Sequence, residues 1–125
     1  MTRSEVDVAR KGRFSVDIVI PVFNEVGIVE ETHSGLRTVI DALPNHFTIY
    51  YVNDGSTDST AASLAALAKR DRRVNVIELS RNFGHQAALT AGIDAAGSDV
   101  VISMDSDVQH PPELIPQMLD LIGQG

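Results

Sequence analysis

The fold of this chain is decided by one stretch, VVISMDSDVQHPPE, which occupies residues 100–113. Its apolar first half predicts a buried β-strand, and its two prolines predict the first turn of a helix, where a missing N–H costs little. Between them lie Asp105 and Asp107, and Gln109 follows two residues later. Because alternate residues of an extended chain point to the same side, the two carboxylates are expected to face the same way.

Two carboxylates and an amide oxygen predict a binding site for a divalent cation. Asp105, Asp107 and Gln109 supply the hard oxygen ligands that Mg²⁺ or Mn²⁺ prefers, and they leave coordination positions for a diphosphate. A lone Asp-x-Asp is more often a solvated turn, since short motifs give many false matches. Polar and acidic residues also follow other predicted strands of this chain, and that clustering favours the metal site.

Strands and helices alternate along the rest of the chain. Apolar runs predict strands at residues 16–21, 47–52 and 74–79 and from residue 99 or 100, and helical spacing predicts helices at 26–43, 58–69, 85–96 and after the proline pair. This alternation predicts an α/β fold, a parallel sheet with helices on both faces. Residues 1–14 are expected to form a flexible leader, and residues 15–125 a domain that looks truncated after four strand–helix units.

Composition limits the class of function. The chain has 125 residues, 43% of them hydrophobic, which suits one globular domain. A net charge of −7 argues against a nucleic-acid partner, and the absence of cysteine excludes disulfides, thiolate catalysis and zinc–cysteine sites. No apolar run approaches the ~20 residues of a membrane span, and the first residues lack the apolar core of a signal peptide, so we expect a cytoplasmic location.

The loops after the predicted strands hold the chemistry, because ligands gather at the carboxyl ends of parallel strands. The first loop lacks the Gly-x-Gly-x-x-Gly of a dinucleotide site, and the chain has no P-loop motif. A nucleobase could lie against Pro21 and Phe23, with Asp54 accepting hydrogen bonds from the base or from a ribose hydroxyl. A phosphoacceptor receiver module is disfavoured, because it needs an acidic pair after the first strand, which here ends in Pro21.

Four ordered motifs resemble those of family-two glycosyltransferases, and most closely those of the polyprenyl-phosphate branch. They are PVFNE at residues 21–25, NDGSTDST at 53–60, SRNFG at 80–84 and DSDVQHPPE at 105–113. The resemblance covers about residues 15–125. It implies a GT-A fold and an inverting transfer of a sugar from a nucleoside diphosphate sugar to a lipid phosphate at the cytoplasmic face of a membrane, with UDP-glucose as the favoured donor.

The resemblance also implies roles for individual residues. Those matched to nucleoside contacts are Pro21, Phe23, Glu25, Val52 and Asp54, with Ser106 beside the ribose or phosphate, and those matched to the cation are Asp105, Asp107 and Gln109. Two positions depart from the usual pattern. Many relatives have Asp where this chain has Asn53, and Tyr where it has Phe23, which keeps the packing and loses a hydroxyl.

Isolated polar residues leave alternatives open. Arg81 either contacts a phosphate or pairs with a nearby acid such as Glu78. His85 and His110 lie near the predicted site, but a role without ligand contact is favoured for both. His33 and His46 are expected on the surface. A second hypothesis for the whole chain is a nucleotide-sugar-binding half-domain without turnover, and a homo-oligomer is one option for its assembly.

Overall fold

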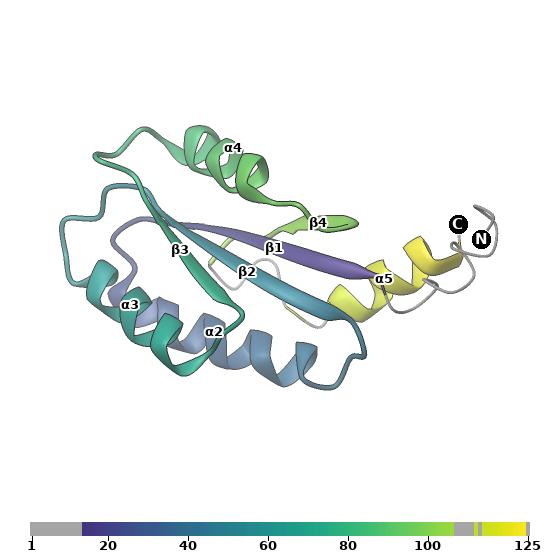
Figure 1. Cartoon of the computed structure of the whole chain (residues 1–125). Helices are drawn as coiled ribbons and strands as arrows, with labels where there is room; N and C mark the ends of the chain where they lie inside the picture. Colours follow the sequence, from purple (N-terminus) through teal and green to yellow (C-terminus); the bar gives the residue numbers. More distant parts are fainter. Residues whose placement is uncertain (1–13, 107–111, 113, 125) are drawn as a thin grey trace.

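The computed structural model describes residues 14–106, 112 and 114–124, and it confirms the predicted α/β architecture (Figure 1). One parallel sheet has the strand order β3-β2-β1-β4. Its strands are β1 (Ser15–Val22), β2 (His46–Asn53), β3 (Val74–Glu78) and β4 (Val100–Ser103), and its helices are α2 (Val26–Ile40), α3 (Thr60–Arg70), α4 (His85–Ala95) and α5 (Leu114–Gln124). No helix in the described ranges combines the length and hydropathy needed to cross a bilayer.

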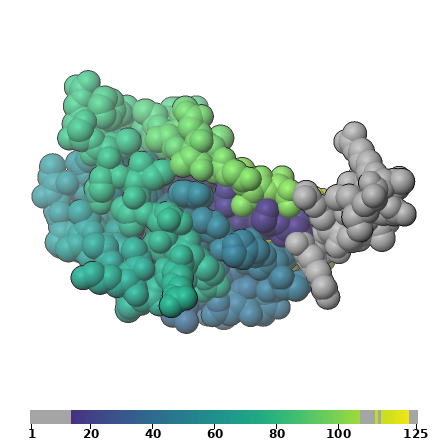
Figure 2. All heavy atoms as spheres, viewed as in Figure 1, coloured from purple at the N-terminus to yellow at the C-terminus, as the bar shows by residue number. Residues whose placement is uncertain are grey.

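Helices cover both faces of the sheet, as the sequence predicts. Helices α2 and α3 lie on one face and α4 lies on the other, above the sheet in Figures 1 and 2. Strand β1 supplies both cores by alternation, because Ile18 and Ile20 belong to the main cluster, whereas Val19 packs with Val52 and Ala88 in the smaller one.

Gly92 allows helix α4 to pack closely against the sheet. A Cβ atom at Gly92 would lie 2.3 Å from Cγ1 of Val19 and 3.0 Å from Cγ2 of Val52. A side chain would collide there, so the backbone of the second half of α4 packs against the side chains of Val19 and Val52 on the two central strands.

Several predicted boundaries are wrong by one to three residues, among them the start of α3 at Thr60 instead of residue 58. Helix α2 ends at Ile40 instead of residue 43, because Ala42 and Leu43 donate to carbonyls only three residues back and tighten the last turn. Phe14, which we assigned to the leader, is buried in the main core, and its carbonyl accepts a hydrogen bond from Asn45 Nδ2 at 3.0 Å. The remainder of the predicted leader, residues 1–13, lies outside the described residues.

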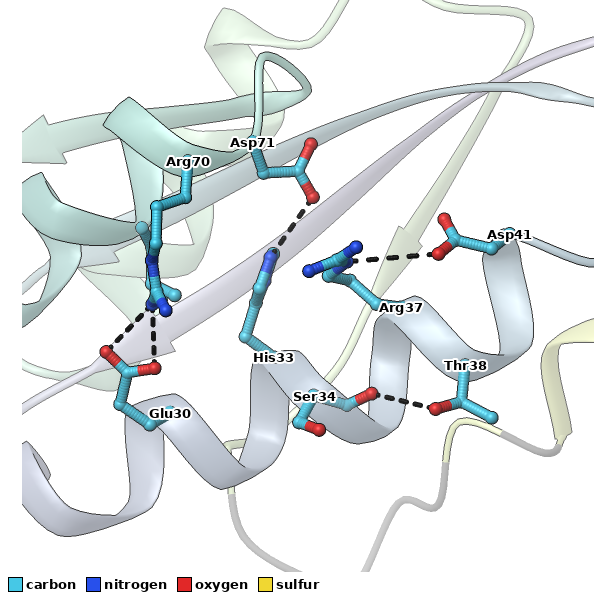
Figure 3. A pocket seen from close by; sticks show the side chains of 9 residues that line it. Glu30, His33, Ser34, Arg37, Thr38, Asp41, Arg70 and Asp71 are labelled. Carbon is cyan, nitrogen blue, oxygen red and sulfur yellow. Dashed lines mark hydrogen bonds and ion pairs between the residues drawn. The ribbon is translucent and has the colours of Figure 1, made fainter.

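The prediction that His33 lies on the surface is wrong, whereas His46 is exposed as predicted. His33 lies 3% exposed under a groove between α2 and α3, with Nδ1 2.8 Å from the Tyr51 hydroxyl and Nε2 3.2 Å from Oδ2 of Asp71 (Figure 3). Hydrogen bonds from Arg73 hold the pKa of Asp71 well below its usual range. The ionised Asp71 therefore accepts from Nε2, and Nδ1 accepts from Tyr51.

The groove itself, about 360 Å³ in volume, is lined by charged side chains that pair with one another. Figure 3 shows Glu30 against Arg70, and Arg37 against Asp41. The Glu30–Arg70 pair thus joins α2 to the end of α3, whereas Arg37 and Asp41 pair within α2 and its C-cap.

The stability of the protein is expected to fall as the pH is lowered from about 7 to about 5. Burial is the main cause that lowers the pKa of His33, and it outweighs the opposing effect of Asp71. The unfolded chain, with a histidine pKa of ~6.5, therefore binds a proton that the folded chain resists, so stability is full above that value and is lost below it. Denaturant titrations at a series of pH values measure this slope.

Matched variants identify the source of that pH dependence. His33→Asn should flatten the slope between pH 7 and 5, because the titrating group is gone, whereas the exposed His46→Asn should leave it unchanged. Equal slopes for His33→Asn and the wild type would show that another group is responsible.

Candidate active site

The register of the sheet brings three loops together at one edge. Val22 is paired with Asn53 across β1 and β2, and Val19 is paired with Ser103 across β1 and β4. The loops that follow β1, β2 and β4 therefore leave the sheet at neighbouring points. The β3–α4 loop leaves from the same edge, at the left of Figure 1.

Asn24 joins the first loop to the second. Its backbone has a φ of +50°, a left-handed conformation that asparagine tolerates better than most residues. Its Oδ1 accepts hydrogen bonds from the backbone N–H groups of Thr57 at 2.8 Å and Asp58 at 3.3 Å, and its own N–H donates to Ser56 Oγ at 3.0 Å. The β1–α2 and β2–α3 loops thus form one unit.

Asp54 joins the second loop to the β3–α4 loop. Its side chain is 3% exposed, and its two oxygens accept from the backbone N–H groups of Phe83 at 2.8 Å and Gly84 at 3.0 Å. The adjacent Gly55 has a φ of +68°, and a Cβ there would lie 2.2 Å from the carbonyl carbon of Arg81. The two loops are therefore in close backbone contact.

The contacts of Asn53 explain why this chain has Asn where many relatives have Asp. Its Nδ2 donates to Oε2 of Glu78 at 2.8 Å, and its Oδ1 accepts from the N–H of Ser56 at 3.1 Å. Asn53 is 2% exposed. An amide can donate to a carboxylate and an aspartate cannot, so Asn53 and Glu78 are a matched pair.

Replacing Asn53 by Asp is expected to destabilise the protein by roughly 2 kcal/mol at neutral pH, because a hydrogen bond to a charged group is replaced by repulsion between two carboxylates. Urea unfolding measures the change. The double variant Asn53→Asp/Glu78→Gln restores a donor–acceptor pair and should recover most of the loss. If the double variant is as unstable as Asn53→Asp, the Glu78 contact is not the cause.

Glu25 joins the first loop to the acidic stretch. One carboxylate oxygen accepts from the N–H of Phe23 at 3.3 Å, and the other accepts a short hydrogen bond from the hydroxyl of Ser106. The backbone N–H of Glu25 donates to Thr60 Oγ1 at 3.0 Å. Glu25, which the family resemblance matches to a nucleoside contact, therefore also holds the segment that contains Asp105.

Two adjoining pockets lie at this edge of the sheet, and they share Pro21, Glu25 and His85. The first, about 190 Å³, is also lined by Phe23, Asp54 and neighbouring loop residues. The second, about 380 Å³, is completed by Asp105 and Ser106. The structure thus brings together most of the residues that the sequence singled out.

Of the three residues predicted to bind the cation, Asp105 is the one that lies in the part of the chain that the structure describes. Its carboxylate is 36% exposed, and Oδ1 lies 3.6 Å from Nε2 of His85. Asp107 and Gln109 lie outside the described residues, and within the described ones no three His, Cys, Asp or Glu side chains are grouped to hold a metal. An accessible carboxylate oxygen facing a polar pocket fits a hard divalent cation.

Two of the predicted site residues are placed differently from the others. The side chain of Val52 is fully buried against Val19 and Ala88, behind the pockets instead of in their walls. The guanidinium of Arg81 lies over the ring of Phe83, 4.5 Å from its centroid, while Glu78, its alternative partner, accepts from Asn53. Their roles toward a ligand stay predictions.

Comparisons with known proteins agree with this arrangement. The chain is 40% identical over 111 residues to the undecaprenyl-phosphate 4-deoxy-4-formamido-L-arabinose transferase of Pseudomonas paraeruginosa, covering 88% of this chain and 33% of that protein. It is 38% identical over 105 residues to the bactoprenol glucosyl transferase of Shigella phage SfV, covering 84% and 34%. The chain therefore spans about a third of the length of these curated relatives.

A solved structure shows the same fold at lower sequence identity. Glucosyl-3-phosphoglycerate synthase from Mycobacterium tuberculosis, in complex with Mn²⁺, UDP and glucosyl-3-phosphoglycerate, superposes with a TM-score of 0.72 at 22% identity, covering 100% of this chain and 45% of that one. The α/β sheet is thus that of the GT-A fold. The model of "Glycosyl transferase family 2" matches residues 17–125. The chain belongs to glycosyl transferase family 2.

Proposed function

We propose that the protein transfers a sugar from a nucleoside diphosphate sugar to a polyprenyl phosphate, with inversion at the anomeric carbon and with a divalent cation, Mg²⁺ or Mn²⁺, at Asp105. The observation that supports this most is the pair of adjoining pockets with Pro21, Glu25 and His85 in common. One pocket has the lining that a nucleoside needs, and the other contains the acid that a cation needs.

The smaller pocket is proposed to hold the nucleoside. Phe23 is 39% exposed and offers an apolar face to a base, next to the buried Pro21. Asp54 borders the same pocket, but each of its oxygens already accepts one backbone N–H. A carboxylate oxygen has two lone-pair sites, so Asp54 retains capacity to accept from a base or ribose. Val52 supports this wall from behind.

The larger pocket is proposed to hold the diphosphate and the cation, with Asp105, Asp107 and Gln109 as the protein ligands and Ser106 beside them. A bound cation would neutralise the charge that develops on the nucleoside diphosphate as it leaves. His85, at the start of α4, lines both pockets and so lies where a diphosphate would pass from one to the other. Arg81 is proposed to contact a phosphate from the neighbouring loop.

The acceptor requires little activation. In an inverting transfer, an oxygen of the lipid phosphate forms the new bond to the anomeric carbon as the bond to the nucleoside diphosphate breaks on the opposite side. A phosphate monoester has a second pKa near ~6, so its attacking oxygen is already anionic at neutral pH. A strong general base is therefore not needed, unlike in transfer to a sugar hydroxyl.

The names of the relatives support the acceptor class, and one of them supports glucose as the sugar. One is an undecaprenyl-phosphate 4-deoxy-4-formamido-L-arabinose transferase and another a bactoprenol glucosyl transferase. We propose UDP-glucose as the donor and a polyprenyl phosphate at the cytoplasmic face of a membrane as the acceptor. The solved neighbour that contains Mn²⁺ and UDP supports a divalent cofactor.

Calorimetric titrations with UDP-glucose and with GDP-mannose, each with and without Mn²⁺, test the proposal. Tight binding of UDP-glucose only with Mn²⁺, followed by transfer of labelled glucose to undecaprenyl phosphate, is the expected result. Binding without transfer would favour the alternative, a nucleotide-sugar-binding half-domain without turnover. Equal binding with and without Mn²⁺ would contradict the role given to the cation.

A further inference from the structure

Ser106, next to Asp105 in the acidic stretch, is held at two points by helix α2 and the residue before it. Its backbone carbonyl accepts a hydrogen bond from Thr32 Oγ1 at 2.7 Å, and its hydroxyl donates to the carboxylate of Glu25. Ser106 is 5% exposed and borders the larger pocket. Both the carbonyl and the hydroxyl of Ser106 are therefore held by hydrogen bonds.

Strand β4 fixes the chain on the other side of Asp105. The N–H of Met104 donates to the carbonyl of Val19 at 2.9 Å, which continues the β1–β4 ladder up to the residue before the acid. Asp105 thus lies between two anchored neighbours, and its carboxylate borders the larger pocket. The backbone on both sides of Asp105 is therefore held by hydrogen bonds.

The same face of α2 also contacts the chain beyond the acidic stretch. Gly35 lies three residues after Thr32 and so shares its face of the helix. A Cβ at Gly35 would lie 3.9 Å from Cγ of Pro112, an ordinary van der Waals distance. Ser106 and Pro112 therefore both lie near this face of helix α2.

We propose that Thr32 is a positioning residue for the cation site: by holding the Ser106 carbonyl, it aims the Asp105 carboxylate at the pocket. This inference rests on the proposed function, since it assumes a cation at Asp105. Thr32 touches neither pocket, so it acts through Ser106 and not by direct contact with a ligand. Groups that orient metal ligands commonly change metal affinity by ~10–100-fold when they are removed.

Thr32→Val is the variant that tests this role, because it keeps the shape of the side chain and removes its hydroxyl. Calorimetry with Mn²⁺ alone should give an affinity about tenfold weaker than that of the wild type, at the lower end of the range for such groups. Binding of UDP without metal should be unchanged. Thr32→Ser keeps the hydroxyl and should restore the Mn²⁺ affinity.

Thr38→Val is the matched control, because Thr38 on the same helix donates to the Ser34 carbonyl at 3.1 Å, away from the pockets. Its Mn²⁺ affinity should equal that of the wild type, while both variants should show similar melting temperatures. If the wild type binds Mn²⁺ and Thr32→Val binds it equally tightly, the positioning role of Thr32 is overturned and the proposed function stands. A wild type that does not bind Mn²⁺ would overturn the cation part of the proposed function, and this inference with it.

Discussion

The double variant Asp105→Ala/Asp107→Ala is expected to lose at least tenfold in affinity for UDP-glucose in the presence of Mn²⁺, a change of about 1.4 kcal/mol or more. The chain is acidic, with a net charge of −7, and the donor is an anion. Without a cation to join them, the diphosphate would face uncompensated carboxylates such as Glu25 at the pocket wall. Calorimetry with and without Mn²⁺ measures the loss.

The removal of negative charge needs its own control. Asp94→Ala/Asp120→Ala removes two exposed carboxylates from α4 and α5, away from the pockets, and changes the net charge by the same amount. This control should bind the donor as the wild type does. Mn²⁺-dependent affinity that survives in Asp105→Ala/Asp107→Ala would remove the metal assignment, whereas metal-free UDP binding should be no weaker in this variant than in the control.

Gly55→Ala is expected to destabilise the protein by about 3 kcal/mol and to weaken donor binding together with stability. A left-handed conformation costs a non-glycine residue roughly 1–2 kcal/mol, and overpacking costs roughly 1–3 kcal/mol more. At Gly55 both apply, since its φ is +68° and the new Cβ would lie 2.2 Å and 2.3 Å from backbone atoms of Arg81 and Asn82. Backbone cannot move aside as a flexible side chain does.

Two other glycines separate these effects. Gly84 has a φ of +105° with nothing within 4 Å of its missing Cβ, so Gly84→Ala should show the backbone strain without the collision. Gly97 has open space and no left-handed φ, so Gly97→Ala should be nearly neutral. Urea unfolding of the three variants should show Gly55→Ala to be less stable than Gly97→Ala by about 3 kcal/mol. If Gly55→Ala is as stable as Gly97→Ala, the contact between the two loops is unimportant.

The architecture could be predicted from the sequence because its signals are local and repeated. The apolar run that ends at Ser103 predicts a strand, and the proline pair predicts a helix after it. The strand is present, but it lies at the edge of the sheet with Val101 40% exposed instead of buried, and Pro112 lies in a turn two residues before α5. The position of Asp105 at a strand end follows from that pattern, and parallel strands place such ends at one edge. The pockets lined by Pro21, Phe23 and Glu25 were therefore foreseeable once the strands were assigned.

What could not be predicted depends on pairs of residues far apart in the chain. His33 looks like a surface residue until Tyr51 and Asp71 are placed beside it, because its polarity suits both settings. Thr32 belongs to no sequence motif. Its proposed role depends on one hydrogen bond to the carbonyl of Ser106, 74 positions away in the sequence. Such contacts are set by helix and strand packing, which a sequence pattern specifies only coarsely.

Asp54 illustrates the limit of a motif most clearly. Its position predicts contact with the nucleoside, but in the structure its oxygens accept from Phe83 and Gly84 and so position the β3–α4 loop. The motif identifies an important acid, and only the fold reveals the structural task that it also performs.

The central claim is that Asp105 holds a divalent cation beside the donor pocket. A crystal structure of the protein with UDP-glucose and Mn²⁺, with the metal located by its anomalous scattering, tests this most directly. The account predicts a manganese peak within ~2.3 Å of an Asp105 oxygen, a distance typical of metal–oxygen bonds, and in contact with the diphosphate. A manganese ion bound elsewhere, with the diphosphate in the pocket and Asp105 turned away from it, would contradict the account.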